Sequence, residues 1–208
     1  TLDGRPAALH AARLSAMPYN TVWPGRQRPV EQTEIAPFLS FESDEAVEVM
    51  VTWPRDFSQV QVRPLSEGVV PSVSGREIRF VLARPGQYTV EADGFHQALH
   101  IFFNPLRDFG VRADDPNVLY YGPGVHRPGR VLLKSHQVVY LDPEAVVYGA
   151  FTALAQEDVL ICGYGIIDGS WEKRETGHGF YLTDPARRLP EMNEAELLRE
   201  LEKQNMLW

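Results

Sequence analysis

The residue types best suited to acid–base chemistry in this 208-residue chain stand together near residue 175. Glu172 and Glu175 precede His178, which lies between Gly177 and Gly179. Carboxylates and imidazoles are the side chains that most often transfer protons in catalysis. The three could form the site of a short enzyme. The alternative is a chance grouping, because the surrounding stretch shows no regular periodicity.

Other reactive residues have structural explanations. His96 and His100 have the HxxxH spacing of some metal sites, but no third ligand accompanies them, and we expect no metal. Asp114 and Asp115 precede a proline, which favours a turn. Asp168 follows an apolar run at a turn, where an aspartate usually accepts hydrogen bonds from backbone amides. We expect no cofactor either.

The elements that would carry these residues repeat along the chain. Paired short apolar runs recur at residues 137–141 and 145–149, then at 158–162 and 165–169. The offset is 21 residues from Val139 to Leu160 and 20 residues from Val147 to Ile167. A period of about 20 residues built from short strands predicts the coils of a parallel β-solenoid over residues 120–170. Two complete coils and a partial one, residues 129–134, are recognisable.

Several residues of this segment are expected to serve the coils. Gly163 and Gly165 are expected to be turn glycines between coils, because their spacing does not match a nucleotide-binding loop. Cys162, the only cysteine, is expected to be buried as a small hydrophobic residue. Tyr164, and Trp171 just beyond the segment, could stack on sugar rings, with ordinary packing as the alternative.

The residues before the repeat predict an antiparallel β-sandwich over residues 38–104. Apolar residues alternate with more polar ones from Val47 to Trp53, as in a half-buried strand. Further short strands follow, separated by turns rich in proline and glycine. Residues 1–37 are expected to be an extended segment laid over a sheet, and residues 105–119 a polar linker.

Residues 171–208 are expected to form an irregular loop and a short C-terminal α-helix. Asn193 and Glu196 make a capping box at the start of a helix over residues 193–204. The open end of the last coil would expose apolar core and unpaired strand edges. We therefore expect this end to be covered by the C-terminal helix itself, by a second chain, or by C-terminal sequence not present here.

Composition and charge narrow the range of partners. The chain carries a net charge of −8 and has a pI near 5.3. Binding to nucleic acid requires basic patches that neutralise phosphates, so neither nucleic acid nor an anionic membrane surface is expected as a partner. No apolar run approaches the roughly 20 residues of a membrane span.

A resemblance to known enzymes rests mainly on the run Tyr120-Tyr121-Gly122-Pro123-Gly124-Val125-His126. Together with the apolar runs 138–149 and 163–169, this run resembles the start of the β-helix in certain glycoside hydrolases. These are the dextranase and isopullulanase family (family 49) and its polygalacturonase-like relatives (family 28). The resemblance implies a β-sandwich followed by a right-handed parallel β-helix, and inverting hydrolysis of a polysaccharide by an aspartate pair.

The chain departs from this pattern at the catalytic positions. The resemblance places the aspartate pair on later coils, and Asp168 corresponds only to an early turn. Polygalacturonases carry a Gly-His-Gly motif beside their aspartates, whereas here its neighbours are Glu172 and Glu175. The resemblance therefore implies the N-terminal part of a polysaccharide-acting hydrolase, and slightly favours a secreted or periplasmic location. The alternative is a non-catalytic carbohydrate-binding or assembly module.

Overall fold

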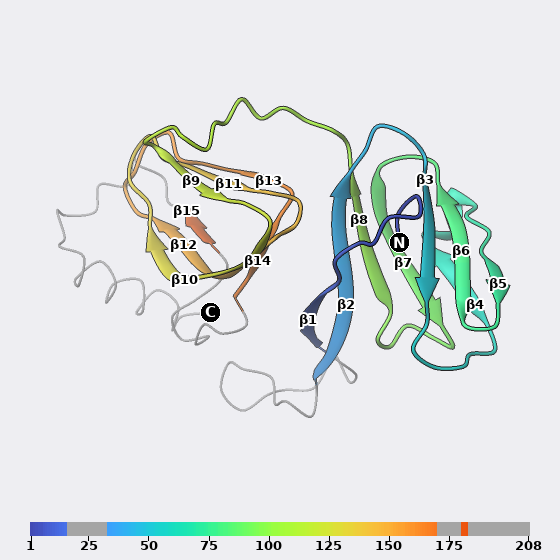
Figure 1. Cartoon of the computed structure of the whole chain (residues 1–208). Coiled ribbons are helices and arrows are strands. Elements are labelled where there is room, and N and C mark those ends of the chain that lie inside the picture. The colour runs from blue at the N-terminus through green and yellow to red at the C-terminus, as the bar shows by residue number, and fades with distance from the viewer. Residues whose placement is uncertain (16–32, 170–179, 183–208) are drawn as a thin grey trace. The chain divides into compact units, whose positions relative to one another are not determined.

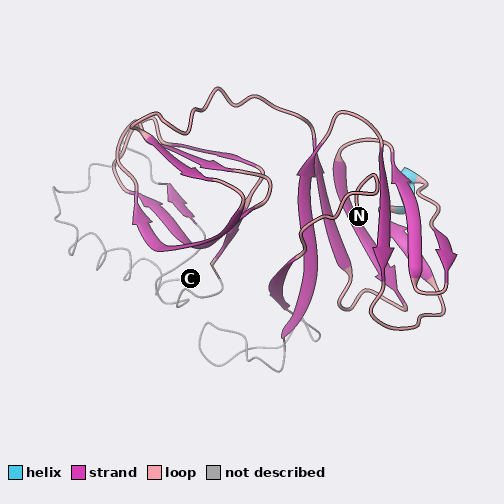
Figure 2. Ribbon diagram, in the orientation of Figure 1, coloured by secondary structure: helices cyan, strands magenta, loops and turns pink. Residues whose placement is uncertain are grey.

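The computed structural model describes residues 1–15, 33–169 and 180–182, and nearly all regular structure in them is β-strand (Figures 1 and 2). The chain divides into two compact units between Arg107 and Asp108. Within the described ranges, one short 3-10 helix, Leu65–Glu67, interrupts the strands, and no helix is long and apolar enough to cross a membrane. The helix expected at residues 193–204 lies outside the described residues.

The first unit contains two sheets. The five-stranded sheet has the order β1-β2-β8-β7-β4, and the three-stranded sheet has the order β3-β6-β5. The strands of the first sheet are β1 (His10–Ser15), β2 (Thr33–Glu42), β8 (Leu99–Asn104), β7 (Gly86–Ala92) and β4 (Val60–Arg63). Those of the second are β3 (Val47–Thr52), β6 (Glu77–Leu82) and β5 (Ser72–Ser74).

Alternating side chains build the core of this unit. In β6, Ile78, Phe80 and Leu82 are buried, while Arg79 and Val81 between them are exposed, as the period of two in a strand requires. One hydrophobic cluster joins these residues to buried side chains of the five-stranded sheet, including Ile101 and Phe103. The strand expected from Val47 onwards is confirmed as β3.

Two expectations for the first unit are wrong. Strands β1 and β2 begin within residues 1–37, which were expected to be an extended segment outside a sheet. In β2, Phe38, Leu39 and Ser40 are all buried, so the alternation that marks a half-exposed strand is absent there. The unit is also not purely antiparallel, because β2 pairs with β8 in parallel.

In the described residues, the second unit forms three successive coils. Each of the first two coils contributes one strand to each of two parallel sheets, and the third contributes one strand to the first sheet and two to the other (Figure 1). The first sheet contains β9 (Val118–Tyr121), β11 (Val138–Leu141) and β13 (Leu160–Gly163). The other contains β10 (Gly124–Leu132), β12 (Ala145–Ala153), β14 (Ile166–Asp168) and β15 (Phe180–Leu182). The residues expected to form a partial coil, 129–134, begin in the second half of β10.

The register between coils follows the inward-facing side chains. Val147 pairs with Ile167, which confirms the offset of 20 residues in this sheet. Val138 pairs with Leu160, so the offset in the other sheet is 22 residues and the predicted 21 is wrong. A change of register by one residue would point the core side chains of the strand outward, because successive side chains point to opposite faces. The observed register instead keeps Val139 and Ile161 together in the core.

The third coil is interrupted by an insertion. Strand β12 pairs first with β14 and then with β15. In β12 two residues, 149–150, separate Tyr148 from Phe151, whereas eleven residues, 169–179, separate their partners Asp168 and Phe180. The predicted catalytic candidates Glu172, Glu175 and His178 fall within this interval of the sequence, outside the described residues.

Candidate functional site

The corner between β9 and β10 is built by the run that carries the family resemblance. The Nε2 of His126 lies 2.7 Å from the carbonyl oxygen of Gly122, so this nitrogen donates the hydrogen bond. The ring of Tyr121 packs edge-on against His126 and against Phe151 inside the coils. Burial raises the pKa of Tyr121 above 10.0. Most of this run therefore serves the fold of the first coil.

A second arrangement crosses all three coils. We call Arg127, Tyr148 and Asp168 the charged row. Between His126 and Gly129 a bulge places two residues of β10 opposite Tyr148, and the guanidinium carbon of Arg127 lies 4.9 Å from the centre of the Tyr148 ring. Tyr148 pairs with Asp168 in the next coil, about 4.8 Å away along the sheet. The row thus combines a donor, a phenol and a carboxylate.

The charged row is suited to binding but not to inverting hydrolysis. That reaction requires two carboxyl groups roughly 6.5–9.5 Å apart. Asp168 is the only acidic residue in the described strands of the coils, and its counterpart in the preceding coil is Tyr148. The described strands of the coils therefore hold no such pair. The three side chains can still exchange hydrogen bonds with the hydroxyl groups of a ligand.

Tyr164, a predicted sugar-stacking residue, belongs to an aromatic cluster. Phe109 packs edge-on against Tyr164, with ring centres 5.4 Å apart, and against Tyr140 at 6.0 Å. This packing fixes the start of the second unit to the coils. The remaining predicted site residues, Trp171, Glu172, Glu175 and His178, lie outside the described residues.

The corner after β13 requires glycines because the backbone of the preceding coil approaches it closely. The carbonyl oxygen of Leu141 accepts hydrogen bonds from the backbone N–H groups of Tyr164 and Gly165, at 3.0 and 3.2 Å. A Cβ on Gly163 would overlap this oxygen, and the φ of Gly163 is +100°. Gly163 and Gly165 are therefore turn glycines as predicted, but they form the corner inside the third coil rather than a link between coils.

Cys162 corrects another expectation. The residue is half-buried rather than buried, because it faces outward beside Tyr140 of the preceding coil. The 22-residue offset places its neighbour Ile161 in the core instead. The thiol thus stands on the outer face of the coils.

The histidines expected to lack a metal lie in the first unit. His96 Nδ1 lies 2.9 Å from a carboxylate oxygen of Glu34, and His100 Nδ1 lies 3.5 Å from the hydroxyl oxygen of Thr89. The described ranges hold no group of three or more histidine, cysteine or acidic side chains arranged to bind a metal ion.

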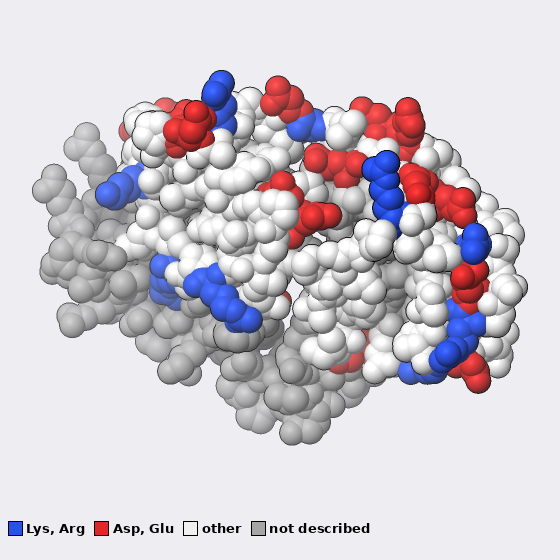
Figure 3. All heavy atoms as spheres, in the orientation of Figure 1, with Lys and Arg blue, Asp and Glu red and all other residues white. Residues whose placement is uncertain are grey.

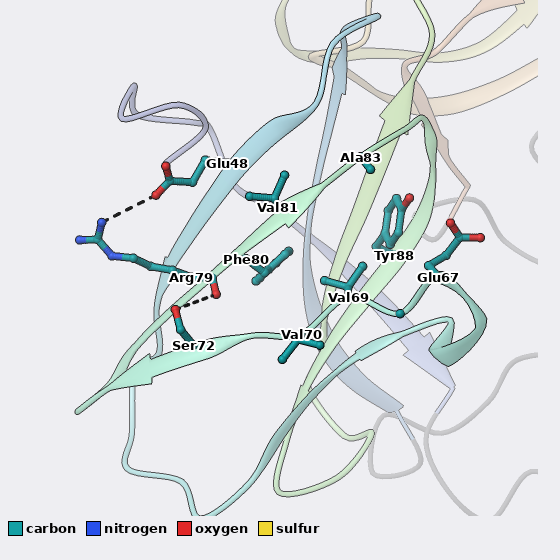
Figure 4. Close-up of a pocket in the computed structure, with 11 residues that line it drawn as sticks. Glu48, Glu67, Val69, Val70, Ser72, Arg79, Phe80, Val81, Ala83 and Tyr88 are labelled. Carbon is teal, nitrogen blue, oxygen red and sulfur yellow. Dashed lines mark hydrogen bonds and ion pairs between the residues drawn. The ribbon is translucent and has the colours of Figure 1, made fainter.

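A hollow of about 560 Å³ opens on the first unit beside β6 (Figure 4). Glu67 accepts two hydrogen bonds from Arg84, at 2.7 and 2.9 Å, and this pairing lowers the pKa of Glu67 below its ordinary 4.5. Arg79 contacts Glu77 at 2.8 Å and Glu48 at 3.7 Å. Each charged side chain that lines the hollow is therefore paired with another charged side chain.

Charged side chains of both signs lie on the surface in view. Figure 3 shows Lys and Arg interspersed with Asp and Glu along the right-hand side of that face. This distribution agrees with the ion pairs of the first unit and with the net charge of −8.

Comparison with known proteins identifies a shared fold. No protein-family model matches the chain, and no curated protein matches it either. Among solved structures, the chain is similar to Dex49A from Penicillium minioluteum, a family 49 dextranase, with a TM-score of 0.51 and 18% sequence identity. The match covers 78% of this chain and 42% of that one. The resemblance to family 49 is thus confirmed for the fold, while that to family 28 stays a prediction.

Proposed function

We propose that this chain is the N-terminal part of a glycoside hydrolase that acts on a polysaccharide. The observation that carries the proposal is the similarity of the fold, over 78% of the chain, to that of a dextranase. The corner run from Tyr120 to His126, on which the resemblance rests, is a structural element of the first coil.

The proposal also specifies the fold of each of the two units. The first unit is a β-sandwich, since its two sheets contribute to one hydrophobic cluster. The coils form the start of a right-handed parallel β-helix, because connections between parallel strands of one sheet are right-handed in about 98% of cases.

The substrate is a neutral polysaccharide, with dextran the first candidate. The chain has a net charge of −8, so it would repel a polyanion such as polygalacturonate. Hydrolysis itself requires an aspartate pair, which lies on coils outside this chain, because Asp168 stands alone on the strands described here. A second chain or C-terminal sequence covers the last coil.

Electrophoresis through gels containing dextran tests the proposal. We expect dextran to retard the protein, polygalacturonate not to retard it, and no reducing ends to be released from either polymer. Migration unaffected by any neutral polysaccharide would refute the proposal. Release of reducing ends by the chain alone would instead refute the location of the catalytic pair. The same assay on a variant with Glu172, Glu175 and His178 all changed to alanine would then test the short-enzyme alternative.

A non-catalytic carbohydrate-binding or assembly module is the second candidate. The presence of a single carboxylate on the described strands of the coils favours it, because a module that only binds needs no catalytic pair. The two candidates differ in the size of the native protein. A native mass of 23.5 kDa together with retention on dextran would favour the module, and a much larger mass would favour the hydrolase.

A further inference from the structure

Tyr120 is the exposed aromatic residue of the corner run. Tyr121, Gly122 and His126 contact one another or the core, and Gly124 combines a φ of +111° with a hydrogen bond to Glu144 of the next coil. Tyr120 faces outward and is 41% exposed. Burial in the core of the coils therefore does not account for an aromatic side chain at this position.

Tyr120 is the outer end of a stacked pair. We call Tyr120, Tyr140 and Cys162 the tyrosine row, since they occupy equivalent positions of three successive coils. The rings of Tyr120 and Tyr140 lie nearly parallel, with an interplanar angle of 15° and centres 5.1 Å apart. Phe109 packs edge-on against Tyr140 and supports the inner end of the stack. Tyr120 is thus held by a ring behind it on an edge strand.

The surroundings of the row favour an uncharged ligand. Strands β9, β11 and β13 contain no charged residue. Their outward-facing side chains besides the row are apolar, and Leu160 among them is 47% exposed. Phenol hydroxyls at the ring edges can donate and accept hydrogen bonds. A flat apolar face bordered by hydroxyls matches a sugar ring, which has C–H groups on its faces and hydroxyls at its rim.

We propose that a hexose unit of a neutral polysaccharide stacks on Tyr120 and continues the tyrosine row by one step. The stack repeats at about 5 Å, the spacing of adjacent strands, so the sugar occupies the place that a ring of a preceding coil would take. Because Tyr140 already fixes the orientation of Tyr120, little side-chain freedom is lost on binding.

This binding surface rests on the proposed function, since it assigns the contact with polysaccharide to a particular face of the coils. It lies on the sheet of β9, β11 and β13, whereas the charged row lies on the sheet of β10, β12 and β14. The tyrosine row holds the polymer and performs no chemical step.

Dissociation constants for dextran oligosaccharides, measured by calorimetry on four proteins, test the proposal. We expect the change Tyr120→Ala to weaken binding about tenfold, the order of magnitude of one lost aromatic contact. Tyr120→Phe, which keeps the ring, should bind within about twofold of the unchanged protein. Val125→Ala is the matched control, because Val125 is 54% exposed in the first coil but lies on the other sheet.

Two further measurements separate stacking from damage to the fold. Tyr120→Leu keeps the apolar bulk without a flat ring, so it should fold normally by circular dichroism yet bind as weakly as Tyr120→Ala. Saturation-transfer NMR should show ring C–H signals of the sugar with the unchanged protein and with Tyr120→Phe, but not with Tyr120→Leu.

The outcomes distinguish this inference from the proposed function. Undiminished binding by folded Tyr120→Leu and Tyr120→Ala would overturn the inference and leave the proposed function standing. Absence of binding by the unchanged protein to any neutral polysaccharide would overturn both. The protein could instead self-associate, with the association lost in Tyr120→Leu and unchanged by added carbohydrate. That result would assign the tyrosine row to a contact between two copies of the chain and overturn the inference.

Discussion

Replacement of Gly163 by alanine should strongly destabilise the coils. A Cβ at this position would overlap the carbonyl oxygen of Leu141 and come within 2.8 Å of its carbon and nitrogen. That backbone belongs to the preceding coil and cannot move independently, because its carbonyl accepts two hydrogen bonds at the corner. Gly163→Ala therefore tests the close approach of the second and third coils.

The expected fall in the free energy of unfolding is the sum of two destabilising effects minus one stabilising effect. Holding a residue with a Cβ at a φ of +100° costs about 1–2 kcal/mol, and overpacking against fixed backbone costs about 1–3 kcal/mol. The reduced freedom of the unfolded chain returns about 0.4–1 kcal/mol. The free energy of unfolding should thus fall by about 1–4.5 kcal/mol. In a domain of this size, this corresponds to a fall in melting temperature of roughly 2–18 °C.

Alanine variants of two other glycines measure the backbone effect and the packing effect separately. Gly124 has a φ of +111° with open space around its Cβ position, so Gly124→Ala should show the backbone cost alone, about 0–1.5 kcal/mol. Gly149 lacks a positive φ, but its Cβ would overlap the carbonyl oxygen of Gly129, so Gly149→Ala should show the packing cost alone. Urea denaturation followed by circular dichroism measures all three. If Gly163→Ala costs no more than Gly124→Ala, the reasoning about the spacing of the coils is wrong.

Three further predictions concern packing and ionisation. Phe151→Ala removes a fully buried ring and should lower the free energy of unfolding by about 3–5 kcal/mol in urea denaturation, whereas Val125→Ala should change it by less than about 0.5 kcal/mol; equal effects would contradict the assigned core. The pKa of Glu67 is lowered by Arg84, so its stabilising contribution is present above pH 4.5 and is lost as the pH falls through its pKa in the folded state. Melting temperatures of Glu67→Gln and the unchanged protein should therefore converge at acidic pH, and a gap that widens there would reverse the assignment. Burial raises the pKa of Tyr121, so the folded state loses stability as the pH rises from 10.0 through that pKa. Tyr121→Phe should remove this loss in alkaline melts, and a loss that persists in Tyr121→Phe would locate the ionising group elsewhere.

The repeat in the coils could be predicted because its signal is local. Val147 and Ile167 recur at the predicted offset of 20 residues and both lie in the interior of the coils, whereas the partner of Val139 is Ile161 rather than the predicted Leu160. Turn glycines such as Gly163 could likewise be identified, since a corner that approaches another backbone closely excludes a side chain.

The tertiary structure decided which strands became neighbours. Strands β2 and β8 pair in parallel although Phe38 and His100 are far apart in the sequence, and both faces of β2 carry buried residues, so no alternation announced it. The one-residue difference between offsets of 21 and 22 turned Cys162 outward, because successive side chains of a strand point to opposite faces.

Both candidate binding surfaces arise in the same way. Arg127, Tyr148 and Asp168 come from three different coils, as do Tyr120, Tyr140 and Cys162, and neither set forms a motif in the sequence. The sequence by itself determined that apolar residues of successive coils would stack, since burial of apolar surface favours any register that aligns them. Only the folded structure fixed which outward-facing residues share a row. Their alignment is a consequence of the backbone register, which the side chains of the interior select.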